Sequence, residues 1–181
     1  MDAAYQTYQE VLAIETLRLG LTHPDVVITL HNIATIDAAR GNHAQALELY
    51  EQVMELQKKL QGDDHITLAV TTACKGDVYE RLGQIEQAIE CFEEALRIKT
   101  VAQGRHSIEV ARLLHKLGKL NAQNGDFHVA DSFLSRSILV YRLNKLPDDD
   151  EWLVDAYRDA ANISAAISMS KAEGNDNVFE C

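Results

Sequence analysis

Apolar and small residues recur along the chain three, four and seven positions apart, which is the spacing of one face of an α-helix. One such stripe consists of Leu30, Ile33, Ala34 and Asp37. It lies in a segment predicted to be helical over 24–40, with Pro24 in the first turn, where its missing N–H costs nothing, and Gly41 as the stop. The chain is therefore predicted to be helical, and the low proline content agrees with this.

The pattern repeats with a period of 42 residues. One glycine series consists of Gly41, Gly83 and Gly125, and a second one, halfway between, of Gly20, Gly62 and Gly104. Two interleaved series of glycines indicate two turns per repeat, so each repeat is predicted to be a pair of helices, A and B. Asn42, Gln84 and Asp126 follow the first series, and we expect Asn42 and Asp126 to be N-caps of helices B.

Small and large residues alternate in a fixed register between the two helices of each pair. Helix A carries a small residue at Ala34, Gly76, Gly118 and Ala160. Helix B carries the pairs Ala46 and Tyr50, Ala88 and Phe92, and Ala130 and Leu134. The alanine lets the helices approach closely, and the larger residue one turn later fills the space beside the small position.

This register resembles the tetratricopeptide repeat signature, which Gly76, Tyr79, Ala88 and Phe92 carry most fully. The stretch 19–25, Leu-Gly-Leu-Thr-His-Pro-Asp, is similar to the junction of kinesin light chain repeats, whose period is also 42. The resemblance covers roughly residues 1–165. It implies an all-α fold, a right-handed α-solenoid of antiparallel helix pairs, and helices A that line a concave, peptide-binding surface.

The register divides the chain into predicted segments. These are a helix B of an incomplete repeat at 1–20, repeats at 21–62, 63–104 and 105–146, a terminal or capping helix A at 147–170, and a frayed tail at 171–181. Because the first helix B has no helix A before it, we expect the chain to be a fragment of a longer array or to self-associate through its N-terminal end.

Charge and cysteine content narrow the possible partners. The formal net charge is -11, which disfavours nucleic acid and anionic membranes as partners. Three cysteines without a C-x-x-C pair, and no signal peptide or membrane span, predict a cytoplasmic protein.

The resemblance also places the groove-facing positions of helices A. Counted from the small residue of each helix A, the predicted peptide-binding residues are His31, Asn32, Thr35, Asp77, Arg112, His115, Lys116, Lys119 and Arg158. The neutral residues among them are suited to hydrogen-bonding a peptide backbone. The basic ones form either a pocket for acidic side chains or a solvated face paired with Glu109, Asp155 and Asp159.

Catalysis is the competing class of function. The chain has no phosphate-binding glycine loop, no H-E-x-x-H and no G-x-S-x-G. Cys74 with His115 lacks an orienting acid, and His23, His65 and His106 recur at junctions, where loop packing explains them. Asp148, Asp149 and Asp150 lack the spacing of a calcium loop, so helix capping is preferred to a cation site. We expect no enzyme activity, metal or cofactor.

The sequence therefore predicts a protein-interaction scaffold that binds a peptide segment of a partner in the groove lined by helices A. Kinesin light chain relatives take acidic segments built around an aromatic residue, and the resemblance implies such a partner. The alternatives are a structural or self-associating array and, last, a cysteine and histidine enzyme.

Overall fold

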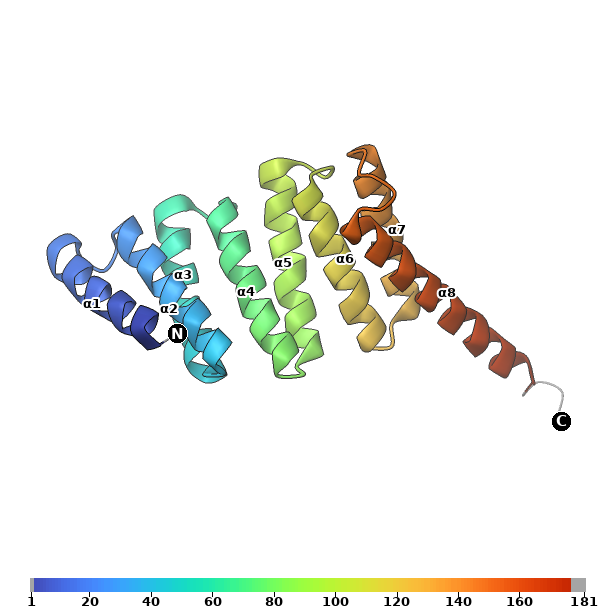
Figure 1. The fold of residues 1–181 in the computed structure, drawn as a ribbon, viewed down its shortest axis with the longest axis horizontal. Coiled ribbons are helices and arrows are strands. Elements are labelled where there is room, and N and C mark those ends of the chain that lie inside the picture. Colours follow the sequence, from blue (N-terminus) through green and yellow to red (C-terminus); the bar gives the residue numbers. More distant parts are fainter. Residues whose placement is uncertain (1, 177–181) are drawn as a thin grey trace. The chain divides into compact units, whose positions relative to one another are not determined.

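The computed structural model describes residues 2–176, of which 4–170 include side chains, and these residues form eight α-helices and no strand. In chain order the helices are α1 (Asp2–Leu19), α2 (Pro24–Arg40), α3 (His43–Gln61), α4 (Ile66–Arg81), α5 (Ile85–Gln103), α6 (Ile108–Gln123), α7 (Phe127–Leu143) and α8 (Glu151–Asp176). Figure 1 shows helices joined by short turns, so the prediction of an all-α fold is confirmed.

The helices group into two compact units, Met1–Ala102 and Gln103–Cys181. In the first unit, α1 packs against α2, α2 against α3, and α3 against α4, while α2 also touches α4. In the second unit, α6 packs against α7, α7 against α8, and α6 also touches α8. In both units, therefore, one helix A touches the next.

Small residues of helices A lie directly against large residues of helices B, as the register predicts. A methyl group added at Gly76 would come within 2.9 Å of the Phe92 ring, and one added at Gly118 within 2.7 Å of Leu134. Phe92 and Leu134 are both buried. Glycine is needed at these two positions because the facing side chain occupies the space of a Cβ atom.

Side chains at the repeat junctions cap the helices A. The Nδ1 atoms of His23 and His65 accept hydrogen bonds from the backbone N–H groups of Asp25 and Thr67. Ser107 Oγ accepts from the N–H of Val110 in the same way. The junction histidines thus satisfy first-turn N–H groups that have no partner within the helix.

Asp150 caps the last helix A. Its Oδ1 atom accepts from the N–H groups of Trp152 and Leu153. The capping role preferred for the acidic stretch is therefore present at its last aspartate.

Asn42 and Asp126 occupy the N-cap positions of α3 and α7, as predicted, but their side chains do not act as caps. Neither side chain makes a capping hydrogen bond. Asn42 instead donates from Nδ2 to Oδ1 of the buried Asp37, over 3.0 Å, and Asp126 accepts from Asn124. Asn42 is thus paired with a residue of the preceding helix, and Asp126 with a residue of the preceding turn.

The last helix runs further than the sequence indicates. α8 continues to Asp176, past the boundary at 170 and through Gly174. A glycine in a helix costs only about 1 kcal/mol relative to alanine, which is too little to force an end by itself. Of the predicted tail, residues 177–181 lie outside the described residues. Among the described helices, none combines the length and apolar character that a membrane crossing requires.

Candidate functional site

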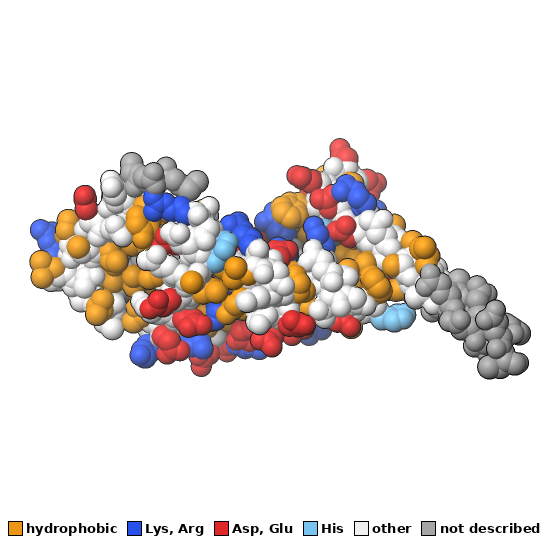
Figure 2. All heavy atoms as spheres, turned by 90° about the horizontal axis from the view of Figure 1, so that it is seen from below, with side chains coloured by type: hydrophobic (Ala, Val, Ile, Leu, Met, Phe, Trp, Pro, Cys, Tyr) orange, Lys and Arg blue, Asp and Glu red, His pale blue; other side chains and the backbone are white. Residues whose placement is uncertain are grey.

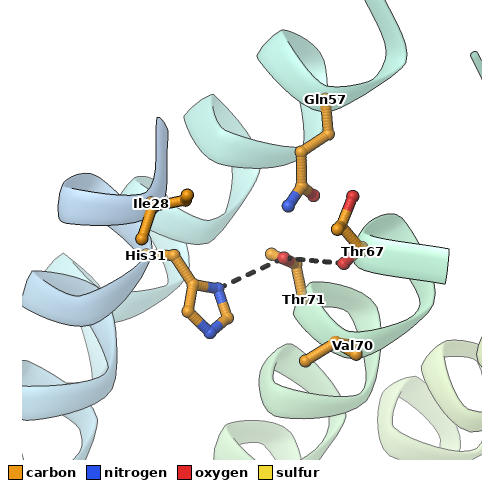
Figure 3. A pocket seen from close by; sticks show the side chains of 6 residues that line it. All are labelled: Ile28, His31, Gln57, Thr67, Val70 and Thr71. Atoms are coloured by element: carbon orange, nitrogen blue, oxygen red, sulfur yellow. Dashed lines mark hydrogen bonds between the residues drawn. The ribbon is translucent and has the colours of Figure 1, made fainter. Parts of the chain in front are cut away.

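In the first unit, α2 and α4 enclose a depression of about 160 Å³. Its lining consists of Ile28, His31, Gln57, Thr67, Val70 and Thr71. Figure 3 shows Ile28 and His31 on α2, Thr67, Val70 and Thr71 on α4, and Gln57 reaching in from α3. Ile28 and Val70 are exposed apolar residues, and His31 comes from the predicted set.

His31 joins the two helices A. Its Nδ1 atom lies 3.2 Å from Thr71 Oγ1, and its ring lies against the Tyr50 ring with centroids 5.7 Å apart. Burial lowers the pKa of His31 from 6.5, so the ring is neutral at pH 7. A neutral imidazole offers one N–H and one lone pair, which suits hydrogen bonding with a peptide.

A second depression, of about 140 Å³, lies further along the same pair of helices. Its lining includes Thr35, Cys74 and Asp77, and Tyr50 from α3. Each of the six lining residues of the first depression has a counterpart seven residues away in the lining of the second, as Ile28 has in Thr35. Seven residues are two helical turns, so the depressions are about 10 Å apart.

Two of the predicted residues, Thr35 and Asp77, line this second depression, while Asn32 is half-buried on α2. Thr35 Oγ1 donates to the carbonyl oxygen of His31 and lies 3.1 Å from the Tyr50 hydroxyl. Burial raises the pKa of Tyr50 to about 12, which keeps this hydroxyl protonated. The structure therefore brings His31, Thr35 and Asp77 to one face of the first unit.

In the second unit, the two predicted arginines are exposed and paired. Arg112 Nη1 lies 2.9 Å from Glu109 Oε1, and Arg158 Nη2 lies 2.7 Å from Asp155 Oδ1. The Arg112 guanidinium also lies over the Trp152 ring, 4.6 Å from its centroid, and so connects α6 to α8. Glu109 and Asp155 are among the partners expected under the alternative interpretation, in which the basic residues form a solvated face.

His115 is buried, with 6% of its surface exposed. Its Nε2 atom lies 2.8 Å from Asp159 Oδ2, so the ring donates to a carboxylate on α8. Because it is buried among α6 and α8, His115 positions these helices and leaves little surface for a ligand. Lys116 is half-buried, and the exposed Lys119 lines a depression of about 190 Å³ together with Asp159.

The cysteines of the described region show no nucleophilic arrangement. Cys74 and Cys91 are both half-buried, and burial raises the pKa of each thiol. A raised pKa lowers the fraction of reactive thiolate. Within the described residues, no three side chains of histidine, cysteine, aspartate or glutamate are grouped so that they could hold a metal ion.

A family model of the tetratricopeptide repeat matches the chain at residues 1–59, 25–99 and 67–142. The chain belongs to the tetratricopeptide repeat family. The matched stretches overlap and together cover residues 1–142. No curated protein matches the chain.

Solved tetratricopeptide structures share the fold. A kinesin light chain-like protein of Podosopora anserina with nearly identical TPR-like repeats has a TM-score of 0.78 at 21% identity, covering 96% of this chain and 82% of that one. BtubC (BKLC) from P. vanneervenii has a TM-score of 0.80 at 21% identity, covering 96% and 69%. The Sgt2 TPR domain from Aspergillus fumigatus has a TM-score of 0.58 at 17% identity, covering 83% of each chain.

These likenesses confirm the tetratricopeptide solenoid and its similarity to kinesin light chain-like repeats. At identities this low they show the fold alone. Proteins of this family are typically protein-interaction scaffolds and not enzymes.

Sequence reasoning missed Gln57 and Thr71, which line the first depression, and Trp152, which lies under Arg112. Gln57 continues the buried stripe of helix B that runs through Tyr50 and Val53. A polar residue at the end of an apolar stripe was the available signal, because buried polar groups need a partner.

Proposed function

We propose that this tetratricopeptide array is a scaffold that holds a peptide segment of a partner protein against the surfaces of its helices A. The segment contributes acidic side chains where it meets α6 and α8. Four cations of these helices carry the proposal, in a chain whose net charge is -11: Arg112, Lys116, Lys119 and Arg158. A local concentration of cations on an acidic protein favours an acidic ligand.

The ion pairs of the two arginines do not prevent this role. Arg112 with Glu109 and Arg158 with Asp155 are exposed pairs one helical turn apart. Such pairs contribute only about 0.3–0.5 kcal/mol. A carboxylate of a partner can therefore replace Glu109 or Asp155 at little cost and gain a two-pronged hydrogen bond from the guanidinium.

The first unit supports the same function through neutral groups. The two depressions between α2 and α4 contain the hydroxyl of Thr35 and the imidazole of His31. Their spacing of about 10 Å matches three residues of an extended peptide, at about 3.3 Å per residue. We propose that this face binds the backbone and the uncharged side chains of a partner segment.

The test uses a fluorescein-labelled nonapeptide rich in glutamate with one central aromatic residue, whose binding is followed by fluorescence anisotropy. We expect the double variant Lys116→Glu/Arg158→Glu to weaken binding at least about tenfold, equivalent to about 1.4 kcal/mol. The matched control is Arg136→Glu/Lys145→Glu, which makes the same charge change on exposed positions outside helices A. Equal losses in both double variants would show a general charge effect and refute the proposed face.

A second candidate function is self-association through α1. Exposed apolar residues gather there, with Leu17 89% exposed and Leu21, in the following turn, 64% exposed. Figure 2 shows apolar side chains on the part of the first unit that carries α1. Sedimentation velocity of the wild type and of Leu17→Glu separates the two functions, because a monomer at high concentration in both proteins excludes self-association.

A further inference from the structure

The first depression of the first unit contains a buried acceptor that has no partner. Gln57 is 7% exposed, and its Oε1 atom is buried without a hydrogen bond. Figure 3 shows the amide of Gln57 reaching from α3 into the space between Ile28 and Thr71. Almost every buried polar atom in a native protein is paired, so an unpaired Oε1 on a side chain that lines a depression indicates a missing donor.

The hydroxyl groups of the lining are already committed as donors. Thr71 Oγ1 donates to the carbonyl oxygen of Thr67, over 3.2 Å, and Thr67 Oγ1 donates to Gln61 Oε1, over 2.6 Å. Each hydroxyl has a single hydrogen, so neither one can turn towards Gln57 without breaking its present bond. The Thr71 hydrogen serves one acceptor at a time, so when it is donated to Thr67 the His31–Thr71 bond requires an N–H at His31 Nδ1.

The remaining lining is apolar and uncharged. The side chains of Ile28 and Val70, 59% and 43% exposed, border the depression on α2 and α4. The lining contains no acidic, lysine or arginine side chain. A charged group placed here would lose its hydration without gaining a counter-charge, which strongly disfavours it.

We infer that this depression is an anchor pocket for a neutral partner side chain that has an apolar body and an N–H or O–H donor, which it gives to Gln57 Oε1. The volume of about 160 Å³ suits a group of ring size, since an apolar cavity of about 150 Å³ holds benzene. The apolar body packs on Ile28 and Val70, and the donor fixes the depth of insertion.

The inference depends on the proposed function only in taking the occupant to be part of a partner protein. Its residues all lie in the first unit, whereas the basic face lies in the second. Small probes test the pocket without a partner, and the variants at Lys116 and Arg158 leave it untouched. Failure of one proposal is therefore distinguishable from failure of the other.

The probes are benzamide and acetophenone, which have nearly the same shape but differ in that only benzamide carries N–H donors. Titration of the full chain is followed by the methyl resonances of Ile28 and Val70 in NMR spectra. We expect benzamide to bind at least about fivefold more tightly than acetophenone, a ratio within the range for a hydrogen bond whose loss leaves a buried group unpaired. Benzylammonium, which adds a charge, should bind more weakly than benzamide.

The decisive variant is Gln57→Met, which keeps the length of the side chain and removes the acceptor. It should bind benzamide and acetophenone equally, while the control Gln52→Met, on the exposed face of the same helix, should keep the preference. The comparison of the two probes on the wild type stands even if Gln57→Met does not fold. Equal binding of both probes to the wild type, tighter binding of benzylammonium, or no shift of the two methyl resonances with any probe overturns the inference.

Discussion

The hydrogen bond between His115 and Asp159 should contribute measurably to the stability of the second unit. Nε2 and Oδ2 lie 2.8 Å apart, with the histidine side chain 8% and the aspartate side chain 28% exposed. A hydrogen bond to a charged group contributes about 1.5–3 kcal/mol, and the partial exposure of Asp159 places this one near the lower end, at about 1.5 kcal/mol. Breaking it should loosen α8 from α6 without unfolding α6.

A double-mutant cycle with His115→Ala and Asp159→Ala measures this contribution by urea denaturation. The control is the same cycle on Arg158 and Asp155, an exposed pair on α8, whose coupling should not exceed about 0.5 kcal/mol. Hydrogen exchange of the α8 amides shows whether the loss is local. If the buried pair couples no more strongly than the exposed one, His115 does not hold the helices together, and its assignment as a packing residue is wrong.

Three further results are expected. Gly118→Ala should lower the free energy of unfolding by about 1 kcal/mol in urea, because its methyl would lie 2.7 Å from Leu134 and overpacking by about 1–3 kcal/mol outweighs the helical gain of alanine. His65→Ala should lose about 0.5–1 kcal/mol of stability in the same assay by removing a capping hydrogen bond, whereas Asp126→Ala should lose almost none, because the Asp126 side chain makes no such bond. Burial lowers the pKa of His31 from 6.5, so the stability that the neutral ring contributes is present above pH 6.5 and is lost as the pH falls through the lower pKa of the folded state. The urea midpoint of the wild type should therefore fall in mild acid, and that of His31→Gln should fall less.

The order of helices and their contacts could be predicted because they depend on residue size in a fixed register. Gly76 and Gly118 face Phe92 and Leu134 as the 42-residue period requires. Glycines end helices for reasons that are local in sequence, so the positions of the turns also followed. The extension of α8 through Gly174 was not predicted, because one unfavourable residue does not outweigh the helix on either side of it.

The candidate site was only partly predictable, because hydrogen bonds depend on side-chain conformation and on neighbours distant in sequence. The register placed His115 among groove residues, but an aspartate 44 positions later draws it into a buried pair. Arg112 and Arg158 are exposed as expected, but each forms an ion pair with an acidic residue one turn away. The register alone does not show whether such an arginine pairs with this acidic residue or with a ligand. Gln57 was not predicted because it lies on a helix B, whereas the groove residues were predicted from positions on helices A.

His31 and His115 occupy the same register position two repeats apart, and comparing them indicates where a ligand can bind. Each one joins its helix A to the next, His31 through Thr71 on α4 and His115 through Asp159 on α8. In the second unit the partner is a carboxylate and the histidine is buried, so the exposed cations beside it are the groups left for a ligand. In the first unit the partner is a hydroxyl, His31 remains half-buried, and a depression lies beside the bond. The same position therefore leaves a charged surface in one unit and a neutral pocket in the other, which is why the two units should bind chemically different parts of a partner.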